Sequence, residues 1–163
     1  MEPRARSKSP KPKSPKSKRA AIMRQLRKMN EEQLRAAILK KKECNAKAAK
    51  IVEKLLDPIE DEKDLLKVLP DINQEHYQDI VEERAIMKIC GFPLCKEQLG
   101  EIPKQKYHIS SSSTKIYDLT ERKHFCSGKC FKSSNYLKMQ LLTSPLWLRD
   151  QEEIPEFKLL SLN

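Results

Sequence analysis

The sequence predicts a mainly helical domain with one small β-hairpin, organised around an embedded site with four cysteine ligands. Three observations support this fold class. Residues 20–57 contain no glycine or proline and place apolar side chains at helical spacing. Two close pairs of cysteines follow. The insert 96–125 between them contains two short runs rich in β-branched and aromatic residues, which are typical of a hairpin.

The composition predicts a small core. Hydrophobic residues make up 38% and charged residues 34% of the 163-residue chain, so the apolar fraction is below that of an average globular domain. A bound metal ion would add folding free energy that such a core lacks. No run approaches the roughly 18 apolar residues of a membrane span, and no secretory signal begins the sequence. We therefore expect one domain with tails, outside the membrane, in a reducing compartment.

The net charge of +10 is concentrated near the start of the sequence. Residues 1–19 hold eight Lys or Arg, one acidic residue and no large apolar side chain beyond Met1. Nothing in this stretch offsets the entropy lost on ordering, so residues 1–20 are expected to form a basic disordered arm. Such an arm suits a nuclear-localisation signal or contact with nucleic acid, and a purely solubilising tail is the alternative.

A long amphipathic helix is predicted for residues 30–57. Asn30, with Gln33 three residues later, resembles a capping box, and Asp57 before Pro58 ends the helix. One helical face carries the apolar residues Leu34, Ala37, Ile38, Cys44, Ala48, Ile51, Val52 and Leu55. Because Cys44 lies on this face, we expect it in the core and not among the metal ligands.

Residues 58–150 are predicted to form the metal-centred domain, and residues 151–163 a C-terminal tail. The expected elements, in chain order, are a short helix at 61–69, a helix capped by Asn73, extended runs at 103–109 and 115–119 that form the hairpin, and a helix at 129–142.

The two cysteine pairs predict a zinc site. The first pair is Cys90 and Cys95, and the second is Cys126 and Cys130. Zinc takes four thiolates tetrahedrally at about 2.3 Å each, and the glycine and proline within the first pair let two sulfur atoms converge. We therefore predict one structural Zn²⁺ held by these four cysteines. Buried free thiols are the alternative, and disulfides are disfavoured because nothing else in the sequence suggests secretion.

Four segments carry a family resemblance: Val81-Glu82-Glu83-Arg84, the loop 90–95, Pro103-Lys104-Gln105-Lys106-Tyr107, and Phe125-Cys126-Ser127. Over about residues 35–150, the chain resembles the family of RNA polymerase II-associated protein 2 and the yeast regulator of transcription. Yeast members carry a histidine where this chain has Cys130, an exchange that preserves zinc ligation.

The resemblance implies a helical domain around an unusual zinc finger. It also implies an atypical protein phosphatase that acts on the C-terminal heptad-repeat domain (CTD) of RNA polymerase II, at phosphoserine in the fifth heptad position. Association with the polymerase and shuttling between nucleus and cytoplasm are further expectations from the same resemblance.

The residues themselves form no standard phosphatase motif. No cysteine has an arginine six positions later, no Asp-x-Asp pair occurs, and zinc with four thiolates has no open position to activate water. The remaining candidate catalytic residues are Glu83, Arg84, Lys104, Lys106, Tyr107 and Tyr117. In this hypothesis the glutamate activates a water, the basic side chains bind the phosphate, and a tyrosine donates a hydrogen bond.

That hypothesis requires the hairpin to fold over the metal loop. The alternative is a structural ion pair between Glu83 and Arg84, with the lysines solvated. Two classes of function therefore stay open: a phosphoserine phosphatase, and a non-catalytic assembly or import factor that binds the phosphorylated repeats. Sequence-specific DNA binding is not expected, because the finger lacks an arginine-rich recognition helix.

Overall fold

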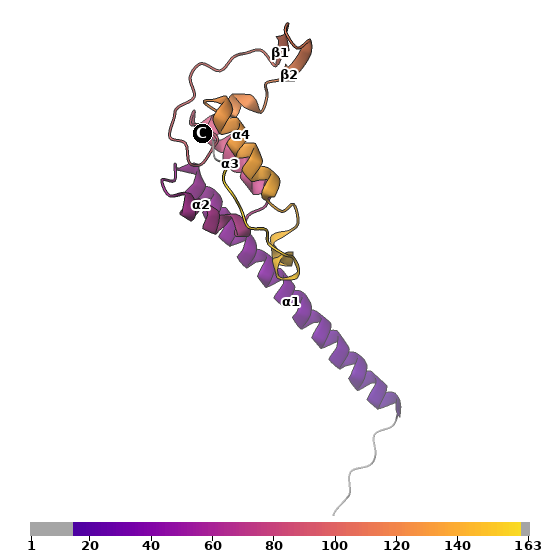
Figure 1. The fold of residues 1–163 in the computed structure, drawn as a ribbon. Coiled ribbons are helices and arrows are strands. Elements are labelled where there is room, and N and C mark those ends of the chain that lie inside the picture. Colours follow the sequence, from indigo (N-terminus) through magenta and orange to yellow (C-terminus); the bar gives the residue numbers. More distant parts are fainter. Residues whose placement is uncertain (1–14, 161–163) are drawn as a thin grey trace, which may run out of the picture. The chain divides into compact units, whose positions relative to one another are not determined.

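The computed structural model describes residues 15–160 (Figure 1). It divides into two units, with the boundary between Lys40 and Lys41. Most of the predicted basic arm, residues 1–14, lies outside the described residues. None of the described helices is both long and apolar enough to cross a membrane.

Helix α1 spans Pro15–Leu56, so it begins well before the predicted start at residue 30. The prediction that disorder extends to residue 20 is wrong for Pro15 onward. Proline is tolerated in the first turn of a helix, and the alanine, leucine, methionine and arginine residues that follow favour helix. Asn30 lies inside the helix instead of capping it.

The first unit contains the N-terminal part of α1, and the apolar side chains described there are exposed. Leu34 is 61% exposed and Ile38 is 49% exposed. The apolar stripe predicted from the sequence is therefore exposed in this unit. In the second unit the same helix buries Ala48, Ile51 and Leu55, as expected.

The second unit builds its core from short helices. They are α2 (Glu62–Val68), the 3₁₀ helix η1 (Leu69–Asp71), α3 (Gln74–Ile86), η2 (Arg122–His124), α4 (Gly128–Gln140) and η3 (Leu146–Gln151). Asn73 caps α3 in a capping box with His76, which confirms the predicted start of this helix. The buried core side chains of these elements include Leu65, Leu69, Tyr77, Ile80, Val81, Leu137 and Leu146, and Ile72 is buried just after η1.

Helices α3 and α4 are joined across their interface by a buried hydrogen bond. The Tyr77 hydroxyl lies 3.0 Å from Ser134 Oγ. Burial raises the pKa of Tyr77 above its ordinary value, so the phenol stays neutral at physiological pH. This pair fixes the helix that carries Glu83 and Arg84 against the helix that follows the second cysteine pair.

The hairpin forms in the predicted insert. Strand β1 (Tyr107–Ser110) pairs antiparallel with β2 (Lys115–Asp118), with Tyr107 opposite Asp118. Seven of the eight strand residues are exposed, and the hairpin stands clear of α3 and α4 in Figure 1. It is therefore no part of the hydrophobic core.

The chain after α4 packs back onto the second unit. Lys41 Nζ lies 4.6 Å from the centre of the Trp147 ring, a cation–π contact. Phe157 and Leu159 pack against the core, and the Lys158 N–H donates to Gln140 Oε1 at 2.8 Å. The predicted tail is thus anchored on α4 through its described residues.

Candidate metal centre and neighbouring site

The four predicted cysteine ligands converge. The Sγ atoms of Cys90, Cys95, Cys126 and Cys130 all lie within 4.8 Å of one another. Cys126 Sγ is 3.7 Å from Cys95 Sγ and 3.7 Å from Cys130 Sγ. Thiolates at about 2.3 Å around one tetrahedral ion would be about 3.8 Å apart, so the spacing fits a four-thiolate metal site.

These distances exclude disulfides, because bonded sulfur atoms lie about 2.05 Å apart. All five cysteines are free thiols. Cys44 lies outside the group of four and packs against the hydrophobic core, as its place on the apolar stripe predicted.

Backbone hydrogen bonds hold the two cysteine loops together. The Gly91 N–H donates to the His124 carbonyl at 2.7 Å, and the Cys126 N–H donates to Cys90 Sγ at 3.5 Å. Ser127 caps α4, because its hydroxyl accepts from the Cys130 N–H at 3.2 Å. The second pair is therefore positioned by a helix start, and the first by the loop after α3.

Gly91 lies in the first cysteine loop at a position where no larger residue fits. A Cβ at Gly91 would lie 2.8 Å from Val81 Cγ1 and 3.0 Å from the His124 carbonyl oxygen. Any larger residue would push the first cysteine loop away from the second. This close approach is what brings the four sulfur atoms within reach of one ion.

Burial controls the protonation of the first pair of thiols. Burial raises the pKa of Cys90, and it raises the pKa of Cys95 to about 11. Without an ion these groups would remain protonated at neutral pH. A bound cation deprotonates coordinating thiols outright, and hydrogen bonds to sulfur from backbone amides would stabilise the resulting charge.

Arg84 has a structural role, which corrects its assignment to phosphate binding. Its side chain is fully buried. Nε donates to the Cys90 carbonyl at 2.8 Å, and Nη1 donates to the carbonyls of Leu55 and Leu56 at 3.2 and 2.7 Å. Nη2 donates to the carbonyls of Phe92 and Cys95 at 3.3 and 2.7 Å. All five N–H groups of the guanidinium are used, so none remains for a ligand.

The ion pair between Glu83 and Arg84, the alternative interpretation, does not form. Glu83 is exposed, and none of its side-chain atoms bonds to Arg84 among the described residues. The arginine instead joins the C-terminal carbonyls of α1 to the loop of the first cysteine pair. Carbonyls at a helix C-terminus lack intrahelical partners and carry partial negative charge, so a buried cation is favourable there.

The other predicted catalytic residues are exposed, and no hydrogen bond or ion pair links those of the hairpin to Glu83 among the described residues. Lys106 Nζ lies 5.3 Å from the centre of the Tyr107 ring, and the Tyr117 hydroxyl lies 3.4 Å from Ser113 Oγ. Lys104 is exposed at the entry to the hairpin. Within the described part of the chain, no hydrogen bond or ion pair joins Glu83 to these four residues.

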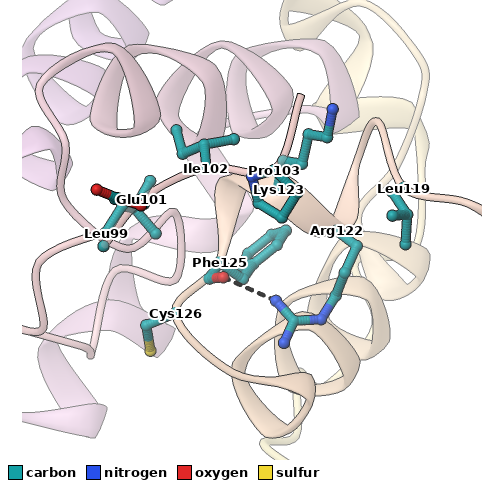
Figure 2. A pocket seen from close by; sticks show the side chains of 10 residues that line it. Leu99, Glu101, Ile102, Pro103, Leu119, Arg122, Lys123, Phe125 and Cys126 are labelled. Carbon is teal, nitrogen blue, oxygen red and sulfur yellow. Dashed lines mark hydrogen bonds between the residues drawn. The ribbon is translucent and has the colours of Figure 1, made fainter. Parts of the chain in front are cut away.

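A pocket lies beside the metal centre (Figure 2). It has a volume of about 450 Å³, and its walls come from segment 99–103 and from Leu119, Arg122, Lys123, Phe125 and Cys126. Phe125 lies in its middle, and the Arg122 guanidinium donates to the Phe125 carbonyl at 2.7 Å. Two basic residues of the pocket, Arg122 and Lys123, lie just before the second cysteine pair in the sequence. They form no recognised motif, so the sequence did not predict the pocket.

Comparison with known proteins places this geometry in a family. The model of the Rtr1/RPAP2 family matches residues 70–142. A Drosophila melanogaster protein named "Putative RNA polymerase II subunit B1 CTD phosphatase RPAP2 homolog" is 54% identical over 132 residues, which cover 81% of this chain and 92% of the fly protein. The chain belongs to the Rtr1/RPAP2 family. The predicted resemblance is confirmed.

Other relatives of the Rtr1/RPAP2 family are longer. The Rattus norvegicus protein "RNA polymerase II subunit B1 CTD phosphatase Rpap2" is 44% identical over 86% of this chain, which spans only 23% of the rat protein. The crystal structure of Rtr1 from Kluyveromyces lactis matches with a TM-score of 0.56 at 21% identity, covering 70% of this chain and 79% of that one. This likeness supports the predicted fold class of a mainly helical domain with a hairpin and clustered cysteines.

Proposed function

We propose that this chain is a protein serine phosphatase that acts on the phosphorylated CTD of RNA polymerase II and so regulates transcription. The observation that carries the proposal is the relationship to the fly protein, which is named for this activity and is matched over nearly its whole length. The preferred target is phosphoserine at the fifth heptad position, and RNA polymerase II is the proposed partner.

We further propose that Cys90, Cys95, Cys126 and Cys130 hold one zinc ion. The support is the separation of the sulfur atoms and the all-sulfur ligand set, which favours zinc over harder cations. Four protein ligands leave no position for water. The ion would therefore stabilise the fold and would not take part in phosphate hydrolysis.

The proposed chemistry falls to the exposed side chains that remain once Arg84 is excluded. Glu83 is the candidate that orients or deprotonates a water, because it is an accessible carboxylate on α3. Lys104 and Lys106 are the candidate phosphate ligands, and Tyr107 and Tyr117 are candidate hydrogen-bond donors. The hairpin would have to approach Glu83 when the phosphopeptide binds, since it makes no hydrogen bond with that residue among the described contacts.

The second candidate is a non-catalytic factor that binds the polymerase or its phosphorylated repeats. The specific observation in its favour is the engagement of Arg84 by five carbonyls, which removes the strongest phosphate ligand of the catalytic hypothesis. Either function is compatible with the proposed distribution between nucleus and cytoplasm, which rests on the family resemblance and the basic N-terminal residues.

Phosphate release from a phosphorylated heptad peptide separates the two candidates. For a phosphatase, Glu83→Gln should bind the peptide as well as the wild-type chain or better, and phosphate release should fall by about 10²–10⁴-fold, as for a lost general base. Glu53→Gln, an exposed glutamate on α1, is the matched control and should keep full activity. Equal release by all three proteins, at matched zinc content, would indicate a contaminating phosphatase and favour the binding factor.

A further inference from the structure

An apolar face of α1 in the first unit has no partner among the described residues. Met23 is 60% exposed, Leu26 is 49% exposed and Leu34 is 61% exposed. In the second unit the same helical period buries Ala48 and Leu55. The first unit therefore presents, on its surface, the side chains of a core-facing helix.

These apolar residues share one side of the helix. At about 100° per residue, Met23, Leu26, Leu34 and Ala37 fall within a sector of about 80°. Met23 and Ile38, which borders this sector, are about 22 Å apart along the helix axis at about 1.5 Å per residue. A helix that binds in a groove of a partner protein uses apolar side chains that share one side over several turns, as these do over about four turns. We call residues 23–38 on this side the apolar face.

Unpaired positive charge lies beside the apolar face. Between residues 23 and 38 the helix has four basic and two acidic residues. Arg24, Lys28 and Arg35 lie within about 40° of one another around the axis. All three are exposed, and none of them forms an ion pair among the described residues. A protein that covers the apolar face would therefore be favoured by acidic residues around its groove.

We propose that the apolar face of α1 is a docking site for an acidic protein with an apolar, methionine-lined groove that binds helices. Calcium-loaded calmodulin has this chemistry and is the probe. A nucleic acid would use the basic residues but leave the apolar face uncovered. A second copy would bring like charges together. A lipid surface is disfavoured because residues 20–42 contain no aromatic side chain.

The test titrates calcium-loaded calmodulin into the full chain by calorimetry. We expect saturable one-to-one binding at micromolar concentrations, and no binding when the titration is repeated with calcium-free calmodulin. The double variant Leu26→Gln/Leu34→Gln should weaken binding about 100-fold, because both anchors are removed. Leu39→Gln is the matched control: Leu39 is 57% exposed on the same helix but outside the apolar face, so its loss should change affinity less than about 3-fold.

A charge variant tests the acidic rim separately. Arg24→Gln/Lys28→Gln/Arg35→Gln should bind more weakly, and its affinity should depend less on salt than that of the wild-type chain. The proposal is overturned if the wild-type chain does not bind calmodulin, or if Leu39→Gln loses as much affinity as the double variant. It is also overturned if the double variant instead abolishes binding to phosphatidylserine vesicles, or dissolves a dimer seen by sedimentation, while calmodulin binding is unchanged. Unaltered metal content in every variant shows that the fold is intact.

Discussion

At the scale of single residues, Arg84 links two segments that are distant in sequence. Its guanidinium donates to carbonyls at the end of α1 and to carbonyls in the loop of the first cysteine pair. The residue therefore stabilises the metal loop from outside the sulfur cluster.

Arg84→Ala should lower the free energy of unfolding by at least about 3 kcal/mol, because several buried carbonyls lose their hydrogen bonds at once. Urea denaturation measures this change. Arg35→Ala is the control, since Arg35 is exposed and unpaired, and should stay within about 0.5 kcal/mol. A stable Arg84→Ala protein that had only lost phosphopeptide binding would restore the original assignment of this residue to phosphate.

Gly91→Ala should lower the free energy of unfolding by about 1–3 kcal/mol, because the new Cβ would meet Val81 Cγ1 at 2.8 Å. Gly100→Ala adds a Cβ with no atom within 4 Å and should change stability by less than about 0.5 kcal/mol. Thermal unfolding of both variants, with metal content measured in parallel, checks the pair. Equal stabilities would show that the two cysteine loops can separate without cost.

Cys126→Ser should lose the metal and unfold, because Cys126 is one of four converging ligands. Cys44→Ser should keep one zinc ion per chain, because Cys44 packs against the core outside the cluster. Elemental analysis of the purified variants gives both results. Loss of metal from Cys44→Ser would mean that the ligand set is wrong.

At the scale of elements, α1 contains two different surfaces. The described side chains from Met23 to Glu43 are exposed, whereas Ala48, Ile51 and Leu55 are buried. The hairpin is likewise an element with little burial, since seven of its eight strand residues are exposed. Residues in the exposed part of α1 and in the hairpin can therefore be substituted, or can contact a partner, without disturbing the core.

Deletion of residues 1–40 should leave the second unit folded. No described side chain of that segment is buried, so the thermal midpoint should shift by less than about 4 °C, which corresponds to roughly 1 kcal/mol or less. Calorimetry of the truncated and full chains measures the shift. A much larger drop in the midpoint would indicate that the first unit contributes to the stability of the second.

At the scale of the whole molecule, metal binding should decide whether the second unit folds. Its core is small, and a few hydrogen bonds and the proposed ion hold the two cysteine loops together. Structural zinc contributes about 10–16 kcal/mol in small zinc-binding peptides, comparable to the total stability of about 5–15 kcal/mol of a typical domain. The ion is thus expected to be essential and not auxiliary.

Removal of the metal with a chelator should abolish the near-ultraviolet circular dichroism of Trp147, because this ring is held by the folded second unit. Addition of zinc should restore the signal. Magnesium serves as the control ion, since it prefers oxygen ligands and should restore nothing. A near-ultraviolet spectrum unchanged by complete metal removal would show that the thiols act as ordinary core residues.

Several features of the molecule were determined by local sequence. Short spacings and caps predicted four features that the structure contains. They are the cluster of four cysteines, the Asn73 cap, the hairpin in the insert and the helix after the second cysteine pair. The family membership also follows from short segments around the four cysteines. Local patterns determine such features because a cap, a turn or a ligand pair involves only residues a few positions apart.

Burial was decided only by the tertiary structure. Nothing in the sequence distinguishes Arg84, which five distant carbonyls surround, from the exposed Glu83 beside it. Likewise, the apolar period of α1 is the same where it is exposed at Leu34 and where it is buried at Leu55. The sequence determined which chemistry each side chain offers. The packing of distant segments determined which side chains remain accessible, because burial depends on the element that covers a residue and not on its neighbours in the chain.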